Sequence, residues 1–270
     1  MTVKSQHLLH LDYKEDKMIK LPVNEPKIAD ITPKSFLIWG ESMSGKTYLA
    51  REFESPLIIN TDGNATKVNT PSVAIKTFAE FAEVIEALKT EKHTYKTVII
   101  DLIDDIETML TIHICEAAKV ESLADIPFGK GYAKFNAVWK KLMIELTQMN
   151  MNVIFISHSI EKSENNGQTM YQAPSLGQKA LNACMGRCDF SIQTKKIGSN
   201  YIRICTNKRE AYKEEDIKDK KILAILKTVK GVFEIKPAIK QVASTKNEDV
   251  SKTTNNTNNT NNINKDGGNK

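Results

Sequence analysis

Four short, uninterrupted apolar runs divide the middle of the chain, and they constrain its fold more than any other feature. Each run has the length of a strand, and its apolar residues do not alternate with polar ones. Strands of this kind are usually buried on both faces of a sheet. The four runs are Phe36–Trp39, Leu57–Ile59, Val98–Ile100 and Val153–Ile156.

Segments with helical periodicity lie between these runs. Thr77 and Glu80 have the spacing of a capping box, which marks the start of a helix. A second helix is predicted from about Asp104 to Val120. A third has one apolar face, made by Phe135, Val138, Trp139, Leu142, Leu146 and Met149. Alternating strands and helices predict parallel pairing through crossovers, which is the α/β class.

The pattern changes after Pro174. A helix is predicted from there to about Cys188, and two segments with alternating polarity follow, Phe190–Thr194 and Tyr201–Cys205. They are joined through a glycine-containing turn at 198–200, which is typical of a hairpin. We therefore expect an antiparallel hairpin that closes one edge of the sheet.

Length and composition favour one folded domain with flanking segments. Of the 270 residues, 40% are hydrophobic and 26% are charged, as in ordinary globular chains. Residues 1–27 are polar and contain proline, and we predict an N-terminal arm there. Residues 28–236 form the predicted core. Residues 237–270 are rich in asparagine and are predicted to be a disordered tail.

Charge and hydropathy limit the partners and the location. The net charge is +5, of which the segment from Lys236 onward, with six lysines and three acidic residues, carries +3. A nearly neutral core does not by itself indicate nucleic-acid binding, which depends on local clusters of cations. No apolar run is long enough for a membrane span, and the first residues lack the apolar block of a signal peptide. We expect a cytoplasmic protein with no membrane partner.

The four cysteines give no sign of a metal site or a disulfide framework. They lack the paired spacing of zinc ligands, and a cytosolic chain of this size has no need of disulfides. We therefore predict reduced packing residues at Cys115, Cys184, Cys188 and Cys205.

A phosphate-binding loop pattern directly follows the first apolar run. Its glycines let successive backbone N–H groups converge on a phosphate, and the following helix points its positive end at the same anion. The lysine is placed to reach the β- and γ-phosphates, and the threonine hydroxyl to bind Mg²⁺. The motif consists of Gly40, Glu41, Ser42, Met43, Ser44, Gly45, Lys46 and Thr47.

A second nucleotide motif ends the third apolar run. Asp101 follows Val98–Ile100, and a carboxylate in that place can reach the Mg²⁺ of a nucleotide bound at the neighbouring loop. Asp104 and Asp105 come just after it. We interpret these two as first-turn acids that complement a helix dipole, and do not assign them to the metal.

Several segments together resemble phage ATP-binding proteins of the RecA-like P-loop NTPase superfamily. More specifically, they are similar to the short RecA-core single-strand annealing proteins of bacteriophages, over about residues 28–235. The resemblance implies a RecA-like core, ATP and Mg²⁺ as cofactors, and single-stranded DNA and further copies of the chain as partners. The segments are the loop at 40–47, Asp62, Asp101, Phe128–Tyr132 and Val153–His158.

The resemblance also implies roles for residues around the nucleotide. Asp62 matches the acid that polarises the attacking water. The family usually has glutamate at this position, so slow hydrolysis is expected. The alternative is that Asp62-Gly63-Asn64 forms a simple turn. His158 matches a polar residue that senses the γ-phosphate at the end of the fourth strand, where a neutral imidazole would donate one hydrogen bond. A histidine satisfied by local backbone is the alternative.

Lys208 and Arg209 match cations that enter the neighbouring subunit's nucleotide site, although Asn207–Glu210 also fits a solvated turn. The stretch 160–172, with Lys162, matches the loop that contacts single-stranded DNA, and an ordinary surface loop has the same composition.

Lys130 and Tyr132 suit single-strand binding by their chemistry, because an ammonium meets phosphate and a phenol ring stacks on a base. A glycine-flanked helix entry explains them equally well. The leading hypothesis is thus a DNA-stimulated ATPase that anneals or pairs strands in phage recombination as a ring or filament. An ATPase that loads or remodels a replication protein, with DNA contact secondary, is the alternative. A single-strand-binding protein is a further candidate partner. A small-molecule kinase would need an arginine-bearing lid, which is not evident.

Overall fold

The computed structural model describes most of the chain between residues 31 and 233. The arm predicted at 1–27 lies outside the described residues except at 21, 23 and 24, and so does the whole tail predicted at 237–270. Within the described part, no helix is both long enough and apolar enough to cross a membrane. The described residues are 21, 23–24, 31–63, 69–164 and 169–233.

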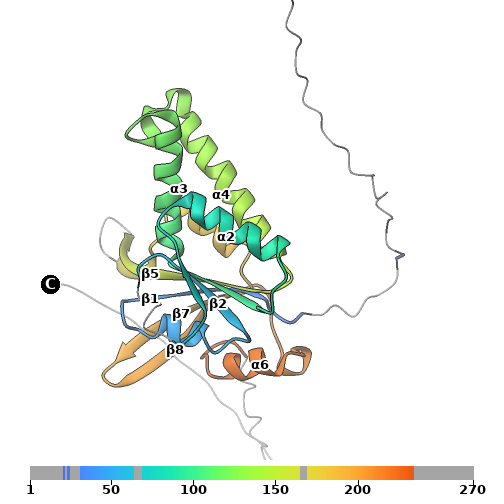
Figure 1. Cartoon of the computed structure of the whole chain (residues 1–270). Helices are drawn as coiled ribbons and strands as arrows, with labels where there is room; N and C mark the ends of the chain where they lie inside the picture. The colour runs from blue at the N-terminus through green and yellow to red at the C-terminus, as the bar shows by residue number, and fades with distance from the viewer. Residues whose placement is uncertain (1–20, 22, 25–30, 64–68, 165–168, 234–270) are drawn as a thin grey trace, which may run out of the picture. The chain divides into compact units, whose positions relative to one another are not determined.

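A mainly parallel sheet forms the centre of the fold (Figure 1). Among the described residues its strands follow the order β3-β2-β4-β5-β1-β7-β8, and β6 pairs with β5. Only the β5–β6 and β7–β8 pairs of this described sheet are antiparallel. The strands are β1 Ser35–Gly40, β2 Pro56–Asn60, β3 Ser72–Ala74, β4 Thr97–Asp101, β5 Asn152–Glu164, β6 Thr169–Pro174, β7 Phe190–Ile197 and β8 Asn200–Lys208.

Helices cover both faces of the sheet. In Figure 1, α2, α3 and α4 lie on one side and α6 on the other. Buried side chains of α2 to α5 share one core cluster with the sheet, while those of α1 and α6 share a second. The helices are α1 Lys46–Ala50, α2 Phe78–Thr90, α3 Ile103–Ala118, α4 Lys130–Gln148, α5 Gln178–Met185 and α6 Lys220–Lys227.

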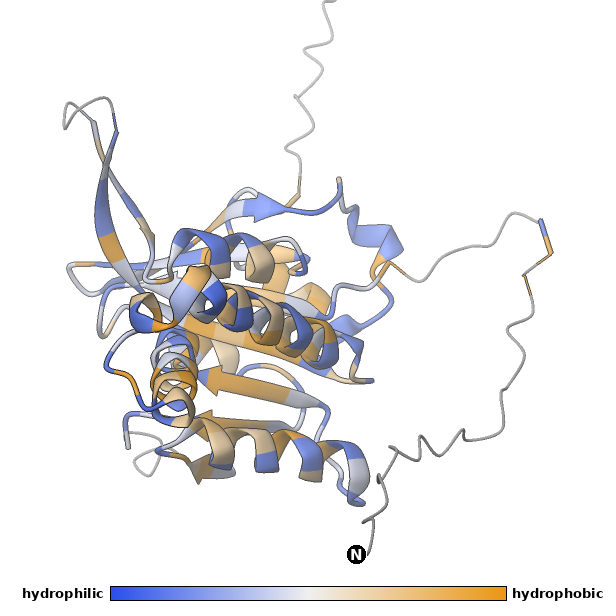
Figure 2. Cartoon of the chain, turned by 90° about the horizontal axis from the view of Figure 1, so that it is seen from above, coloured by the Kyte–Doolittle hydropathy of each residue, from blue (hydrophilic) through white to orange (hydrophobic). Residues whose placement is uncertain are grey.

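The two cores explain why the strands lack alternating polarity. In β1, Leu37 and Trp39 belong to one core cluster, and Phe36 and Ile38 belong to the other. Every residue of β1 is buried, and full burial of one such side chain contributes about 1.5–3 kcal/mol. Figure 2 shows this as apolar strands enclosed by helices whose outer sides are hydrophilic. The predicted α/β architecture, a mainly parallel sheet flanked by helices with an antiparallel hairpin at one edge, is confirmed.

The predicted helices are present with small shifts of their ends. The Thr77 side chain accepts from the Glu80 N–H at 3.2 Å, and the Glu80 carboxylate accepts from the Thr77 N–H at 3.2 Å, which is the predicted capping box. The helix predicted over 104–120 is α3. The helix predicted after Pro174 is shorter than expected, because α5 ends at Met185. Cys115, Cys184 and Cys188 are buried in the core, as predicted.

The segment after Ile156 differs from the prediction. We expected the strand to end at about His158 and a loop to follow over 160–172. Instead β5 continues to Glu164, and β6 returns beside it from Ser159 paired with Pro174 to Glu164 paired with Thr169. The outer half of this hairpin is largely exposed, so backbone pairing rather than apolar burial holds it together. Residues 165–168, within the predicted loop, lie outside the described residues.

Candidate functional site

The phosphate-binding loop connects β1 to α1 at the carboxyl end of the parallel strands. A Cβ atom on Gly40 would lie 2.2 Å from the carbonyl oxygen of Thr194 in β7, so no larger residue fits there. Gly45 has a φ of 91°, in the left-handed region that glycine favours. The Ser44 and Thr194 hydroxyls lie 2.7 Å apart and tie the loop to the sheet. Both glycines of the predicted motif are therefore required by the local geometry.

The Lys46 side chain contacts the backbone at the start of the phosphate-binding loop. Its Nζ donates to the carbonyl oxygens of Gly40 at 3.1 Å and Glu41 at 2.8 Å. Burial lowers the pKa of Lys46, while the charges of Asp101, Asp104 and Asp62 raise it in part. This buried ammonium donates to two carbonyl oxygens, and it can donate to phosphate oxygens instead when a nucleotide is bound.

Thr47 and Asp101 meet across the site. The Thr47 hydroxyl donates to Asp101 Oδ2 at 2.7 Å, which brings together the two motifs from β1 and β4. The strand β5 lies between β1 and β4 in the sheet. A hydroxyl and a carboxylate are the hard oxygen ligands that Mg²⁺ takes, beside phosphate oxygens and waters. The predicted pair therefore fits a magnesium ion that accompanies a nucleotide.

Burial raises the pKa of Asp101 to about 6, although the Thr47 hydrogen bond lowers it in part. Between about pH 4 and about pH 6, the folded state therefore retains a proton that the unfolded state releases. Rising pH should thus lower the free energy of unfolding by up to about 3 kcal/mol over this window, with no further loss above it.

Asp101→Asn removes this titration. Relative to wild type in the presence of a chelator, the variant is expected to gain stability from about pH 4 to about pH 6, and to keep a constant advantage above pH 6. Denaturant unfolding of both proteins across this range measures the difference. Parallel stability curves for the two proteins would contradict the assigned pKa.

Asp62 lies just past the end of β2, in an exposed turn that Gly63 closes by donating its N–H to Asn60 Oδ1 at 2.7 Å. The turn interpretation of this segment is thus correct as local structure. The charge of Asp62 nevertheless acts on both Lys46 and Asp101. Asp62 thus acts electrostatically on the phosphate site, and its predicted role in orienting water stays a prediction.

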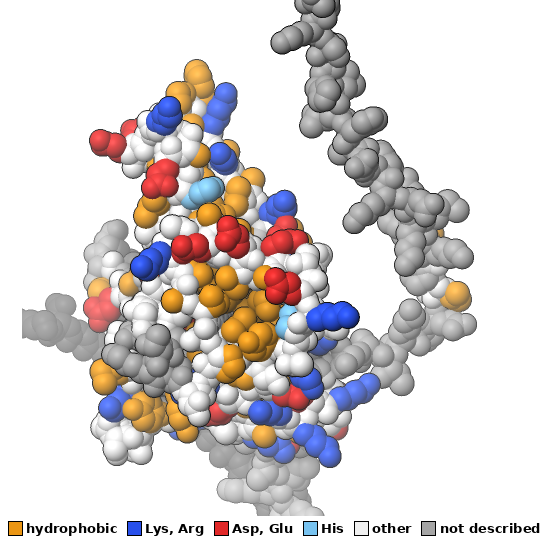
Figure 3. All heavy atoms as spheres, viewed as in Figure 1, with side chains coloured by type: hydrophobic (Ala, Val, Ile, Leu, Met, Phe, Trp, Pro, Cys, Tyr) orange, Lys and Arg blue, Asp and Glu red, His pale blue; other side chains and the backbone are white. Residues whose placement is uncertain are grey.

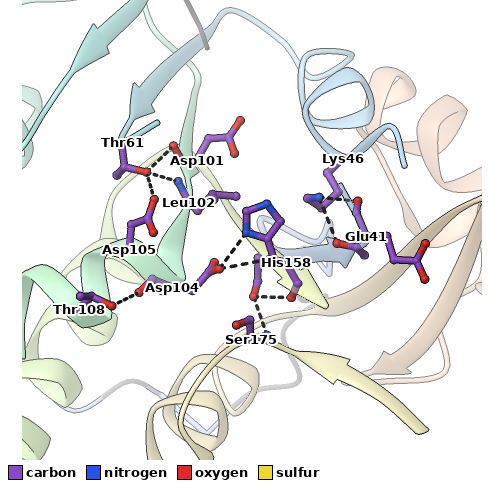
Figure 4. A network of polar contacts seen from close by, with 12 residues as sticks. Glu41, Lys46, Thr61, Asp101, Leu102, Asp104, Asp105, Thr108, His158 and Ser175 are labelled. Atoms are coloured by element: carbon purple, nitrogen blue, oxygen red, sulfur yellow. Dashed lines mark hydrogen bonds and ion pairs between the residues drawn. The ribbon is translucent and has the colours of Figure 1, made fainter. Parts of the chain in front are cut away.

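His158 lies inside β5, which corrects its predicted position at a strand end. It pairs with Gly40 in the sheet register, so it lies beside the start of the phosphate-binding loop. Its Nδ1 is 3.2 Å from Asp104 Oδ2 (Figure 4). Burial raises the pKa of Asp104, and interactions with His158 lower it in part. Asp104 is thus a first-turn residue of α3, as predicted, but it also contacts a predicted site residue.

Lys208 and Arg209 lie at the other end of the sheet from their own phosphate-binding loop. Because β8 runs antiparallel to β7, Lys208 pairs with Phe190 at the start of β7, whereas Thr194 pairs with Gly40. Lys208 Nζ donates to the carbonyl oxygen of Val232 at 3.0 Å. Arg209 Nε lies 3.2 Å from Asp189 Oδ1. Their role in a neighbouring subunit stays a prediction.

The predicted DNA-contact residues occupy two projections. Lys130 and Tyr132 begin α4 at the tip that joins α3 to α4 (Figure 1), and Phe128 beside them is 95% exposed. The Lys130 ammonium lies 5.8 Å from the centre of the Phe128 ring. Figure 3 shows hydrophobic and basic side chains together at this tip. Lys162 lies on the β5–β6 hairpin instead of in a loop.

A cavity of about 980 Å³ lies against the phosphate-binding loop. The sequence did not indicate which residues line the side of the cavity opposite the loop. Tyr201, near the start of β8, brings its ring within 3.0 Å of the place where a Gly45 Cβ would be. Arg203 forms the polar side, where it donates to Glu52 Oε2 at 3.0 Å and Thr228 Oγ1 at 2.7 Å. The alternating pattern of the hairpin predicted these strands, but could not show that one of them faces the loop.

A second unpredicted contact joins the loop to the β5–β6 hairpin. Gln172 of β6 donates from Nε2 to Glu41 Oε1 at 2.7 Å, and its Oε1 accepts from Gln193 Nε2 of β7 at 2.8 Å. Glu41 is the second residue of the motif, between Gly40 and the later Gly45 and Lys46. One amide side chain thus connects the phosphate-binding loop, the hairpin and strand β7.

Two comparisons with known proteins give partial matches. The chain is 27% identical over 135 residues to the SPbeta prophage-derived uncharacterized protein YorG of Bacillus subtilis strain 168, a match that covers 47% of this chain and 42% of that protein. The chain thus spans less than half the length of this relative. A crystal structure of the RadB recombinase matches with a TM-score of 0.41 and 16% identity, over 66% of this chain and 83% of the other.

A family model described as AAA domain matches residues 32–216. The match includes both nucleotide motifs and all strands of the described sheet. Because it spans more than half of the sequence, the chain belongs to the AAA domain family.

Proposed function

We propose that this protein is a magnesium-dependent ATPase that acts on single-stranded DNA in phage recombination, by annealing or pairing strands. The observation that carries the nucleotide part is the 2.7 Å contact between Thr47 and Asp101 beside the buried Lys46. Three residues from two separate motifs thereby converge on one phosphate site. Membership of the AAA domain family supports the same chemistry.

Each residue of the site has a distinct task in this proposal. Lys46 and the loop N–H groups bind the β- and γ-phosphates, and Thr47 and Asp101 would hold Mg²⁺, which supplies charge neutralisation to the phosphates. Asp62 orients the attacking water. The rest of the nucleotide fits the cavity beside the loop, because Tyr201 offers a ring for stacking and Arg203 and Thr228 offer polar groups.

Two features support single-stranded DNA as the partner. The tip carries Phe128, Lys130 and Tyr132, which combine exposed rings with an ammonium, and such sets bind bases by stacking and the backbone by charge. The hairpin with Lys162 is joined to the phosphate-binding loop through Gln172 and Glu41. ATP binding at the loop can thus alter the position of the hairpin, which is the surface proposed to contact DNA. The prophage origin of the relative supports a phage role.

Assembly into a ring or filament belongs to the same proposal. A cation delivered by a neighbouring copy would stabilise charge on the transferring phosphoryl group. Lys208 and Arg209 lie far from their own loop in the sheet register, so a nucleotide that they contact belongs to a neighbouring copy. For that contact they would exchange their present partners, Val232 and Asp189.

The test is ATP turnover with and without single-stranded DNA, together with DNA affinity with and without ATP. We expect DNA to stimulate turnover and ATP to strengthen DNA binding, with affinity that falls as salt rises. Lys130→Ala combined with Tyr132→Ala should weaken DNA binding, whereas Lys140→Ala, an exposed residue farther along α4, should not.

Other outcomes decide between the alternatives. ATP turnover with neither DNA binding nor DNA stimulation would replace this proposal with an ATPase that loads or remodels a replication protein, such as a single-strand-binding protein. Phosphate transfer to a nucleoside monophosphate would replace both with a kinase. Arg203 near the cavity is already bound by Glu52 and Thr228, so it does not provide the lid that a kinase needs.

A further inference from the structure

We infer that Asp104 and His158 act as a pair in which the His158 Nε2 atom accepts a hydrogen bond from the water that attacks the γ-phosphate. His158 is then a catalytic residue, and Asp104 is a positioning residue that acts through it. The inference rests on the proposed ATPase function. It changes the role of His158 from a donor that senses phosphate to an acceptor that orients water.

The two side chains come from different elements that meet at the site. Asp104 lies in the first turn of α3, just after Asp101, and His158 lies in β5, the strand between β4 and β1. Asp104 Oδ2 lies 3.2 Å from His158 Nδ1 and 3.5 Å from the His158 backbone N. One carboxylate oxygen thus contacts both the ring and the main chain of the same residue.

This contact selects one form of the imidazole. A neutral imidazole carries one N–H donor and one acceptor nitrogen. A carboxylate can only accept, so the proton belongs on Nδ1 and the lone pair on Nε2. Similar carboxylate contacts fix the tautomer and orientation of histidines in other sites. In this tautomer His158 cannot donate from Nε2 to a phosphate oxygen, but it can accept from a water.

The imidazole faces the phosphate site. In the view of Figure 4 the His158 ring lies between Asp104 and Lys46, with Asp101 above it. His158 interacts with the charge on Asp101, and Asp104 interacts with that on Lys46. The His158 side chain is 40% exposed, whereas that of Asp104 is 13% exposed. The ring is therefore accessible to a water, while its carboxylate partner is enclosed.

Asp104 is fixed more firmly than a surface acid would be. Its Oδ1 is buried and has no hydrogen-bond partner among the described residues. Burial raises the pKa of Asp104, whereas its own backbone N–H and the contacts with His158 lower it in part. The N-terminus of α3 also favours a negative charge there. Rotation away from His158 would break both Oδ2 contacts of this largely buried carboxylate, which costs free energy.

The chemical step balances with these groups. The water oxygen forms a bond to the γ-phosphorus as the bond to the β,γ-bridging oxygen breaks, and that electron pair leaves with ADP. One water proton remains on the phosphate product, and the other passes to His158 Nε2 and then to solvent. A water donates two hydrogen bonds, so Asp62 can accept the second while His158 accepts the first.

The first experiment needs no nucleotide. In ¹⁵N-labelled full-length protein, at a pH where the imidazole is neutral, the ring nitrogen shifts report which nitrogen is protonated, and His158→Gln identifies the signal. We expect Nδ1–H in wild type, and a mixture of tautomers in Asp104→Asn, because an amide can donate or accept. An Nε2–H tautomer in wild type would overturn the inference, whatever the variants do.

The second experiment is a double-mutant cycle in ATP hydrolysis. Asp104→Asn is expected to lower kcat about 100-fold with KM for ATP changed less than about twofold, and to have no further effect when His158 is already glutamine. Glu116→Gln, an exposed acid on α3, is the matched control and should leave kcat unchanged. Equal losses from Asp104→Asn with and without His158 would show a merely structural role.

Failure of the proposed ATPase activity is recognised separately, because wild-type protein would then neither bind nor hydrolyse ATP. The tautomer measurement still decides on the Asp104–His158 contact in that case. Thermal unfolding of each variant verifies that lost activity is not lost folding.

Discussion

Replacing Lys46 by alanine is expected to weaken ATP·Mg binding about 100-fold and to abolish measurable hydrolysis. Lys46 provides the buried ammonium of the loop, and its two present partners are carbonyl oxygens that phosphate oxygens can replace. Charged hydrogen bonds contribute about 1.5–3 kcal/mol each, and about 1.4 kcal/mol is a tenfold change in affinity. Fluorescence titration with a labelled ATP analogue measures the loss.

Lys92→Ala is the matched control, because Lys92 is exposed beyond the end of α2. It should bind ATP as wild type does. The Lys46 variant should also fold normally, since removal of a buried charge relieves its desolvation. Unchanged affinity in folded Lys46→Ala protein would show that the loop does not bind the triphosphate.

The largest expected effect on stability follows from Trp139→Ala in α4. Trp139 is 1% exposed, and its ring stacks on that of Phe135 with 5.9 Å between centroids. Its indole N–H donates to the carbonyl oxygen of Ala180 at 3.1 Å, which joins α4 to α5. Truncation leaves a cavity and an unpaired carbonyl group, so the free energy of unfolding should fall by about 3–5 kcal/mol.

Urea unfolding followed by circular dichroism measures this loss. Lys141→Ala on the exposed side of the same helix should change the free energy of unfolding by less than about 0.5 kcal/mol. A loss of under about 1 kcal/mol in Trp139→Ala would mean that α4 does not pack on the sheet as described.

The centre of the fold was predictable because burial on both faces leaves a strong signal in the sequence. All residues of β1 and β4 are buried, so their apolar runs have no polar interruptions. The glycines of the loop and the capping box at Thr77 are equally local, because each depends on residues within a few positions. The four buried strands, the helices between them and the two nucleotide motifs could therefore be located without knowledge of tertiary contacts.

The β5–β6 hairpin could not be predicted in the same way. Its outer residues, such as Glu161 and Glu164, are exposed and polar, so they carry no apolar periodicity. The position of Lys208 depends on the direction of β8, and its distance from the phosphate-binding loop follows only once that strand is paired with β7. Hairpin prediction alone did not show which end of the sheet these cations reach.

The remaining site residues depend on contacts between distant segments. Asp104 was identified as a first-turn acid from its place in α3, but its contact with His158 joins residues 54 positions apart. Tyr201 reaches Gly45 from β8, the strand at one edge of the described sheet. Such contacts are set by the packing of strands and helices, and no local pattern in one sequence encodes them.

Calorimetric titration of ATP into the protein, with and without Mg²⁺, tests the central claim most directly. If Lys46, Thr47 and Asp101 form a triphosphate site, the titration should show saturable heat with one site per chain, and removal of Mg²⁺ should weaken the binding. Absence of any binding heat in folded protein across several temperatures would contradict the account.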